Sequence, residues 1–357
     1  MTTLPNATVV APPGPIVPGG RSRVTACWLF VVAALVLVMV VVGGATRLTG
    51  SGLSITEWKP ITGALPPLSA TDWANTFRRY RGSSQFHLIN QGISLSEFKV
   101  LFWWEWAHRL LGRSIGVVFA APFLALLVMR RIPPRLVGRC VVLLGLGGLQ
   151  GLAGWWMVKS GLEGRASVAP ERLMVHLGLA LALLSALVWT GLEVWFGATR
   201  GLPDDRRGWR SAVALFAGGV FLQCMFGALV AGSGAGRIDI DWPLMAGRVI
   251  PEDYWQGALW TTLAHSRAAV QFNHRLLAYV LLALGCGLAT FATLADGIPT
   301  AVVRLSRLVV GLLFIQAALG VATLVTGDPI GLALAHQANA AVLLSLAISL
   351  AWRIRRP

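Results

Sequence analysis

The chain has 357 residues, of which 55% are hydrophobic and 13% are charged, and its formal net charge is +15. This composition is typical of a polytopic membrane protein and excludes an ordinary soluble globular domain. The basic residues are spread between apolar segments and form no groove-reading motif, so the positive charge does not indicate a nucleic-acid partner.

Residues 1–24 are rich in Pro, Gly and Val and lack the pattern of a signal peptide, so we expect a disordered cytoplasmic amino terminus. From Cys27 to Gly43 the chain is apolar and uncharged, close to the roughly 20 residues that cross a bilayer. Seven similar segments follow, and the expected spans are 101–129, 139–158, 172–196, 211–231, 268–294, 303–326 and 331–352. The sequence therefore predicts an all-α polytopic membrane protein with eight transmembrane helices.

Arginine is concentrated in both termini and in the short connections after even-numbered spans. These arginines are Arg21, Arg23, Arg130, Arg131, Arg135, Arg139, Arg200, Arg206, Arg207, Arg210, Arg304, Arg307, Arg353, Arg355 and Arg356. Because cytoplasmic segments carry an excess of basic residues, we expect both termini to be cytoplasmic. The two longest loops, after spans 1 and 5, then face outward.

An internal repeat divides the spans into two halves. In each half a tryptophan follows a glycine by 15 residues, and a glutamine follows a histidine by 42 residues. The pairs are Gly43 and Trp58, His108 and Gln150, Gly227 and Trp242, and His274 and Gln316. Four spans return the chain to its starting side, so the repeat is parallel and predicts two pseudo-symmetric four-helix bundles. We expect the amino-terminal half at 25–198, a cytoplasmic linker at 199–210 and the carboxy-terminal half at 211–357.

Four histidines stand near the outer ends of spans that run from outside to inside, and all four are expected at one depth. They are His108, His176, His274 and His336. An imidazole is costly in lipid unless it binds something, and two pairs suggest two haems held by axial histidines. We favour pairing within each half, because duplication implies an ancestral unit that was competent alone, although two other pairings are open. A zinc or copper site is an alternative, but no carboxylate or thiol recurs beside the histidines in both halves.

Three charged residues beside the histidines are further candidates. Arg109 and Arg275 directly follow two of the histidines and could hold haem propionates, or could simply extend to the interface. Glu105 lies three residues before His108 on the same helical face, whereas Gln271 takes the corresponding place in the second half. This asymmetry predicts chemistry in the amino-terminal half and a fixed cofactor in the other, unless Glu105 is a solvated interfacial acid.

Five motifs, in the correct order and on the expected spans, resemble the haem A synthase family. They are GGATRLTGSGLSITEWKPITGALPPLS, EFKVLFWWEWAHRLLGR, GALVAG, DWPLMAGRVIP and QFNHRLLAYV, and the similarity covers about residues 25–352. The resemblance implies a membrane oxidoreductase of cytochrome oxidase assembly. Such an enzyme oxidises the C8 methyl group of haem O to a formyl group, which gives haem A.

The resemblance also implies roles for the candidate residues. A haem b would be held by His274 and His336, and the substrate haem O would lie near His108 and His176, with Glu105 as a functional residue. The implied location is the bacterial inner membrane, and the haem O synthase is the expected supplier of substrate. Neither the electron acceptor nor the oligomeric state follows from the sequence, and a homo-oligomer is one option.

The first outward loop, from Ala45 to Lys99, contains no cysteine. In this the chain resembles the cysteine-free subgroup found in proteobacteria and mitochondria, and a mechanism that needs a thiol pair in this loop is excluded.

Two functions other than haem A synthesis are open. A di-haem cytochrome b would usually place its haems at opposite depths, and a haem transporter or chaperone would not need Glu105.

Overall fold

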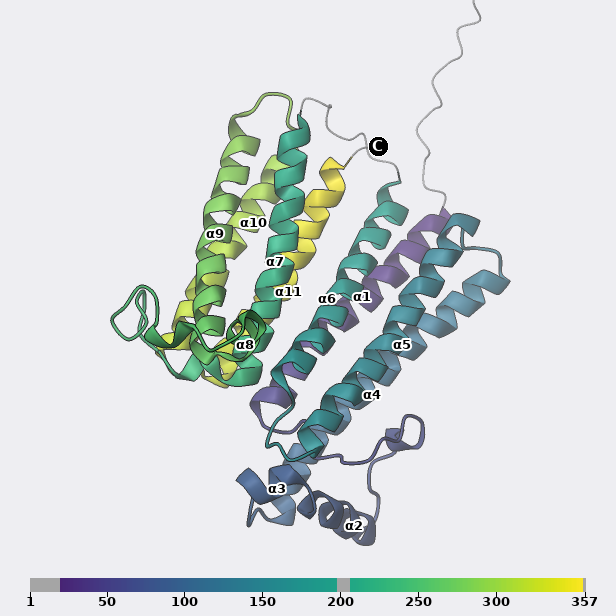
Figure 1. Cartoon of the computed structure of the whole chain (residues 1–357). Coiled ribbons are helices and arrows are strands. Elements are labelled where there is room, and N and C mark those ends of the chain that lie inside the picture. Colours follow the sequence, from purple (N-terminus) through teal and green to yellow (C-terminus); the bar gives the residue numbers. More distant parts are fainter. Residues whose placement is uncertain (1–19, 198–205, 356–357) are drawn as a thin grey trace, which may run out of the picture.

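The computed structural model describes residues 20–197 and 206–355 and shows a helical molecule (Figure 1). Eight helices are long and apolar enough to cross a membrane. They are α1 (Gly20–Leu48), α4 (Leu95–Val128), α5 (Pro134–Leu162), α6 (Pro170–Phe196), α7 (Arg207–Ser233), α9 (Arg267–Leu294), α10 (Thr300–Val325) and α11 (Ile330–Ile354). No β-strand forms within the described ranges. The predicted all-α fold with eight membrane helices is confirmed.

Two predicted segments fall largely on undescribed residues. Residues 1–19 of the expected leader and 199–205 of the expected linker lie outside the described ranges. Helix α1 begins at Gly20 and α7 at Arg207, so both helices start a few residues before the spans expected from composition.

The eight helices form two groups of four. The amino-terminal group contains α1, α4, α5 and α6, and the carboxy-terminal group contains α7, α9, α10 and α11 (Figure 1). In each group every helix packs against the next one in the chain, and the last packs against the first. The groups meet where α6 contacts α7 and where α1 contacts α11. The four helices of each group therefore contact one another in the same cyclic sequence.

The contact between the groups is apolar for most of its length and carries two polar links near one end. Leu184 and Leu187 of α6, Phe216 of α7 and Leu344 of α11 are all buried in one continuous core. Gln337 of α11 donates a hydrogen bond of 2.6 Å to the carbonyl of Val40 on α1. Arg47 at the end of α1 donates to the carbonyl of Ala231 on α7, at 2.5 Å. These links tie each group to the other at the depth of the histidines.

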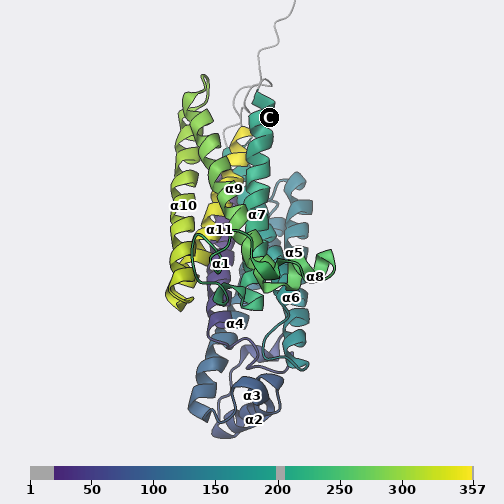
Figure 2. The ribbon, with the colours of Figure 1, turned by 60° about the vertical axis from the view of Figure 1, so that its left-hand side comes forward.

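Two long loops, residues 49–94 and 234–266, lie at the same end of the molecule, called here the loop end (Figure 2). The first loop contains η1 (Thr62–Ala64), α2 (Ala70–Arg81) and α3 (Ser84–Ile89). The second contains η3 (Ala235–Arg237), η4 (Glu252–Tyr254) and α8 (Leu259–His265). Both described ends of the chain lie at the opposite end (Figure 1).

Helix α4 begins six residues earlier than the expected span. Ser94 caps it, since its hydroxyl accepts from the Glu97 amide and the Glu97 carboxylate accepts from the Ser94 amide at 2.7 Å. The extra turns carry Phe98, and Phe102 follows just inside the expected span. Both are buried against the aromatic rings of α2, where Tyr80 stacks on Phe98 with centroids 5.0 Å apart. The first loop is thus a small aromatic-cored layer that covers the end of α4.

Candidate functional site

The two histidines of the carboxy-terminal group face each other. His274 on α9 and His336 on α11 have ring centroids 6.5 Å apart, and their planes are inclined by 73°. An imidazole nitrogen binds a first-row metal at about 2 Å, so two imidazoles on opposite sides of one metal have ring centres roughly 6 Å apart. Both rings are half-buried. The spacing therefore fits axial ligation of one iron by this pair.

Each of the four histidine rings lies against a glycine of the preceding long helix. The pairs are His108 with Gly43, His176 with Gly154, His274 with Gly227 and His336 with Gly320. A Cβ atom at Gly154, Gly227 or Gly320 would lie 3.0, 3.2 or 2.9 Å from the Cε1 atom of its histidine, and one at Gly43 would lie 3.5 Å from His108 Nε2. At the first three positions a side chain would displace the imidazole, so these glycines preserve room for the ring.

Three of the histidines also have a glutamine beside them, four residues before the glycine. Gln150, Gln223 and Gln316 place their Nε2 atoms 3.2, 3.1 and 3.2 Å from the Nδ1 atoms of His176, His274 and His336. The first two also donate to the backbone carbonyl of the same histidine, at 3.1 and 2.9 Å. An imidazole that ligates a metal keeps a hydrogen on its other ring nitrogen, so a glutamine orients it through the amide oxygen. The Oε1 atoms of Gln150 and Gln223 are buried without another partner and are free for that role.

Sequence reasoning found only part of this pattern. The repeated spacing marked Gln150 and Gln316, but Gln223 was missed. The signal that would have found it is the four-residue step from glutamine to glycine, which occurs in α5, α7 and α10 at the depth of the histidines.

The amino-terminal pair is arranged more loosely. His108 on α4 and His176 on α6 are both half-buried. In the described part of the chain, no ring contact like that of His274 and His336 joins them, and the His108 side chain makes no hydrogen bond. The two pairs therefore share their helix positions and glycine contacts but differ in how firmly their rings are held.

Glu105 is a buried, fully bonded carboxylate and not a solvated interfacial acid. It is 2% exposed. One oxygen accepts from the Ser54 hydroxyl at 2.7 Å and the Ile55 amide at 2.8 Å, and the other accepts from Arg109 Nη2 at 2.6 Å. Arg109 lies one turn further along α4 and is 18% exposed in its side chain. The carboxylate thus joins the first loop to α4 within a turn of His108.

Arg109 and Arg275 hold the two long loops through matching carbonyls. Arg109 donates to Ile55 and Glu57 at 2.9 and 3.2 Å. Arg275 donates to Asp239, Asp241 and Leu244 at 2.6, 2.9 and 2.9 Å. Ile55 and Asp239 each stand 12 residues after the glycine that contacts the histidine, and Glu57 and Asp241 each stand 14 after it, whereas the Leu244 contact has no counterpart at Arg109. Contact of these arginines with haem propionates stays a prediction.

The two groups differ at the residue one turn before each arginine. Gln271 donates to the Asp239 carbonyl at 3.0 Å, but its Oε1 atom and Arg275 Nε are buried without a partner. In the amino-terminal group the Glu105 carboxylate accepts from the equivalent Arg109 Nε, at 3.1 Å. Of the two helix residues at this matching position, Glu105 carries a charge and Gln271 does not.

Other metal chemistry finds little support. Among the residues that the structure describes, no group of three or more His, Cys, Asp or Glu side chains is placed to hold a metal ion.

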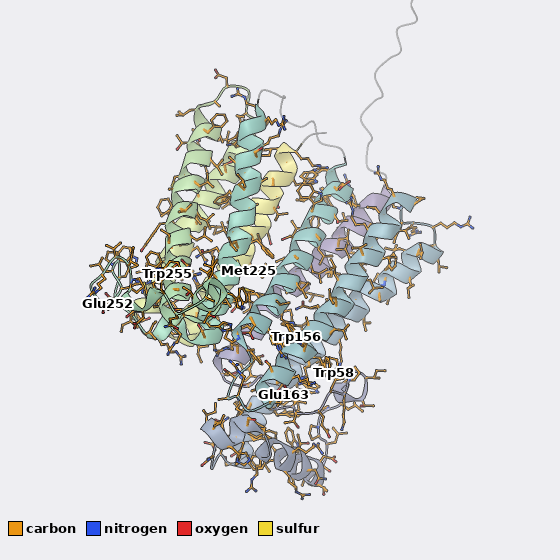
Figure 3. All side chains as sticks on the ribbon, viewed as in Figure 1. Trp58, Trp156, Glu163, Met225, Glu252 and Trp255 are labelled. Atoms are coloured by element: carbon orange, nitrogen blue, oxygen red, sulfur yellow. The ribbon has the colours of Figure 1, made fainter. Side chains whose placement is uncertain are left out.

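Tryptophans occur toward both ends of the helices. Trp58, Trp156 and Trp255 lie toward the loop end (Figure 3), and the helix segments at the opposite end carry Trp28, Trp195, Trp209 and Trp352. This is the pattern of an interfacial aromatic belt.

Comparison with known proteins gives a consistent result. A family model described as "Cytochrome oxidase assembly protein" matches residues 26–348. The chain is 56% identical over 337 residues to the haem A synthase of Caulobacter vibrioides, which covers 94% of this chain and 98% of that protein. It is 46% identical over 333 residues to the haem A synthase of Parvibaculum lavamentivorans, with 93% of each chain covered. Identity to the haem A synthase of a Bradyrhizobium species is 44% over 357 residues, 99% of this chain and 94% of the relative.

Proposed function

The chain belongs to the haem A synthase family of cytochrome oxidase assembly proteins, and we propose that it converts haem O into haem A within its amino-terminal group. The reaction would oxidise the C8 methyl group of haem O to a formyl group. The observation that carries the assignment to this group is the buried Glu105 carboxylate one turn from His108, where the other group has an amide.

In the carboxy-terminal group, His274 and His336 would hold a resident haem b, which supplies one-electron redox chemistry when it is bound. Their 6.5 Å spacing supports this. Gln223 and Gln316 keep the two rings oriented, and Gly227 and Gly320 leave room for them. The task of these residues is to keep the cofactor in place, because a resident group must survive repeated turnover.

In the amino-terminal group, His108 and His176 would bind the substrate haem O. The position of Glu105 on the helix of His108 puts an anionic oxygen beside the substrate, where it would stabilise positive charge or accept a proton. Arg109, Ser54 and Ile55 hold that carboxylate in one orientation. Since the reaction is an oxidation, electrons must leave to an external acceptor.

The topology that we propose has the loop end outside the bacterial inner membrane and both termini in the cytoplasm. Fifteen of the 30 Lys and Arg fall in the two termini and the short connections after even-numbered spans, and the positive-inside rule then supports this orientation. The matching helix contacts support two pseudo-symmetric halves, with the substrate in the first and haem b in the second. Haem O is lipophilic and would enter laterally, and the haem O synthase is the expected source.

The alternatives are less consistent with the geometry. All four histidines belong to the half of the membrane nearer the loop end, whereas a cytochrome b that carries electrons across the bilayer needs haems at two depths. A haem transporter would have no use for the buried, charge-paired Glu105.

Co-expression of the chain with a haem O synthase in cells that lack haem A tests the function. Haems extracted from the membranes are separated by chromatography and identified by mass. The proposal expects a formyl-bearing haem A that is absent when the chain is absent. Accumulation of unchanged haem O, with a folded and haem-loaded chain, would refute it.

A further inference from the structure

The glutamine that accompanies three of the histidines is replaced by methionine at the fourth. The glutamines stand four residues before the glycine that contacts the histidine ring, at Gln150, Gln223 and Gln316. On α1 the glycine in contact with His108 is Gly43, and the residue four positions earlier is Met39. Met39 and Gln223 thus occupy the same position in the first helix of each group.

Met39 reaches across to the helix that carries His108. A Cβ atom at Gly112 of α4 would lie 3.4 Å from the Met39 methyl carbon, which is van der Waals contact. The residue at the matching place on α9, four after His274, is Ala278. A thioether has no hydrogen to donate and is only a weak acceptor. A methionine at this position therefore gives His108 neither a donor for its backbone carbonyl nor a strong acceptor for its ring N–H.

The difference changes how firmly a ligating imidazole is held. Loss of a partner that fixes the orientation of a ligating histidine lowers the metal affinity of the site by roughly 10–100-fold. Three of the four rings have such a partner and His108 has none among the described residues. Both imidazoles of the carboxy-terminal pair are held by amides. In the amino-terminal pair only His176 is held in this way.

We propose that Met39 makes His108 the releasable ligand of the substrate haem, so that haem O can enter and haem A can leave while haem b stays bound. Met39 acts as a positioning residue through His108. The inference rests on the proposed function for the identity of the two haems. It follows from a functional difference between the groups: a substrate must exchange in every turnover and a resident cofactor must not.

Exchange of haem from the purified full-length protein tests this. The chain is loaded in cells that make haem O, reconstituted into lipid nanodiscs and mixed with excess apomyoglobin as a scavenger. Haem remaining on the protein is extracted at intervals and separated by chromatography. Since haem b reports on the carboxy-terminal group and haem O or haem A on the amino-terminal group, the two release rates are measured in one sample.

Three variants decide the outcome. Met39→Gln is expected to slow release of haem O and haem A about tenfold without changing that of haem b. Gln223→Met, the reciprocal change, is expected to speed release of haem b about tenfold and leave the other haem unaffected. Met39→Leu, which keeps the volume but also lacks a donor, is expected to release haem O at the rate of the unaltered protein.

Equal release rates of haem O in Met39→Gln and the unaltered protein would overturn the inference, and so would slowed release in Met39→Leu. Should Met39→Gln fail to fold, Gln150→Met serves the same purpose. It removes the amide from His176 and is expected to speed release of haem O, and an unchanged rate would count against the inference. The proposed function is judged separately, by whether haem A forms at all in the unaltered protein.

Discussion

His274 and His336 face each other across the carboxy-terminal group with their ring centroids 6.5 Å apart. We expect His336→Ala to abolish the bound haem b, because one imidazole cannot supply both axial ligands. The absorption spectrum of the reduced, purified protein measures this. His87 on α3 is exposed, and His87→Ala is the matched control that should retain the full spectrum. Retention of haem b by His336→Ala would remove His336 from the ligand set.

His108→Ala is expected to have the opposite effect on the two haems. The substrate haem should lose a ligand and haem A formation should stop, whereas haem b should stay because its proposed ligands lie on α9 and α11. Extraction and chromatography of the haems from one preparation report both quantities. Loss of haem b from this variant would show that the histidines pair between the groups.

Glu105→Gln is expected to lower conversion of haem O by roughly 10²–10⁴-fold, the usual contribution of a positioned acid or base. The amide reproduces the residue found at the matching position, Gln271, and leaves Arg109 bound to the loop carbonyls. The fold and haem binding should therefore persist, and haem content with a conversion assay measures both. Wild-type conversion by a folded Glu105→Gln protein would make this carboxylate only a loop anchor.

Gly320→Ala is expected to weaken haem b binding about tenfold, since its Cβ atom would lie 2.9 Å from His336 Cε1 and push the ring aside. Gly311→Ala, on the same helix, is the control, because no atom lies within 4 Å of a Cβ at that position. Haem b per chain after purification measures the effect. Equal haem content in the two variants would contradict the steric role of Gly320.

Arg275→Gln is expected to free the second long loop, because it removes three hydrogen bonds to loop carbonyls. Limited proteolysis should then cut residues 234–266 several times faster. Arg248→Gln is the control, since the Arg248 ion pair with Glu252 is largely exposed and worth about 1 kcal/mol at most. A loop that stays resistant in Arg275→Gln would mean that other contacts fix it.

The spans and the histidines could be predicted from the sequence because both depend on local composition and spacing. Eight apolar segments of sufficient length and four histidines at repeated positions need no tertiary information. The early start of α4 could have been suspected from the Ser94 and Glu97 capping pattern, but its outer turns are stabilised by Phe98 and Phe102 against α2. That packing depends on how the first loop folds.

The environment of the histidines was harder to predict for a different reason. Gln223 and Met39 occupy matching positions, but the residues differ, so a search for repeated residues passes over both. The partners of Arg109 and Arg275 are backbone carbonyls, which leave no mark in the sequence. The repeat therefore indicates where the four candidate histidines lie, but not which of their rings have an amide beside them.

Locating the iron atoms in the purified, haem-loaded protein by electron cryo-microscopy tests the central claim most directly. The account expects one iron between His274 and His336 and a second between His108 and His176, both nearer the loop end. An iron shared by histidines of different groups, or one ligated by none of the four, would contradict it.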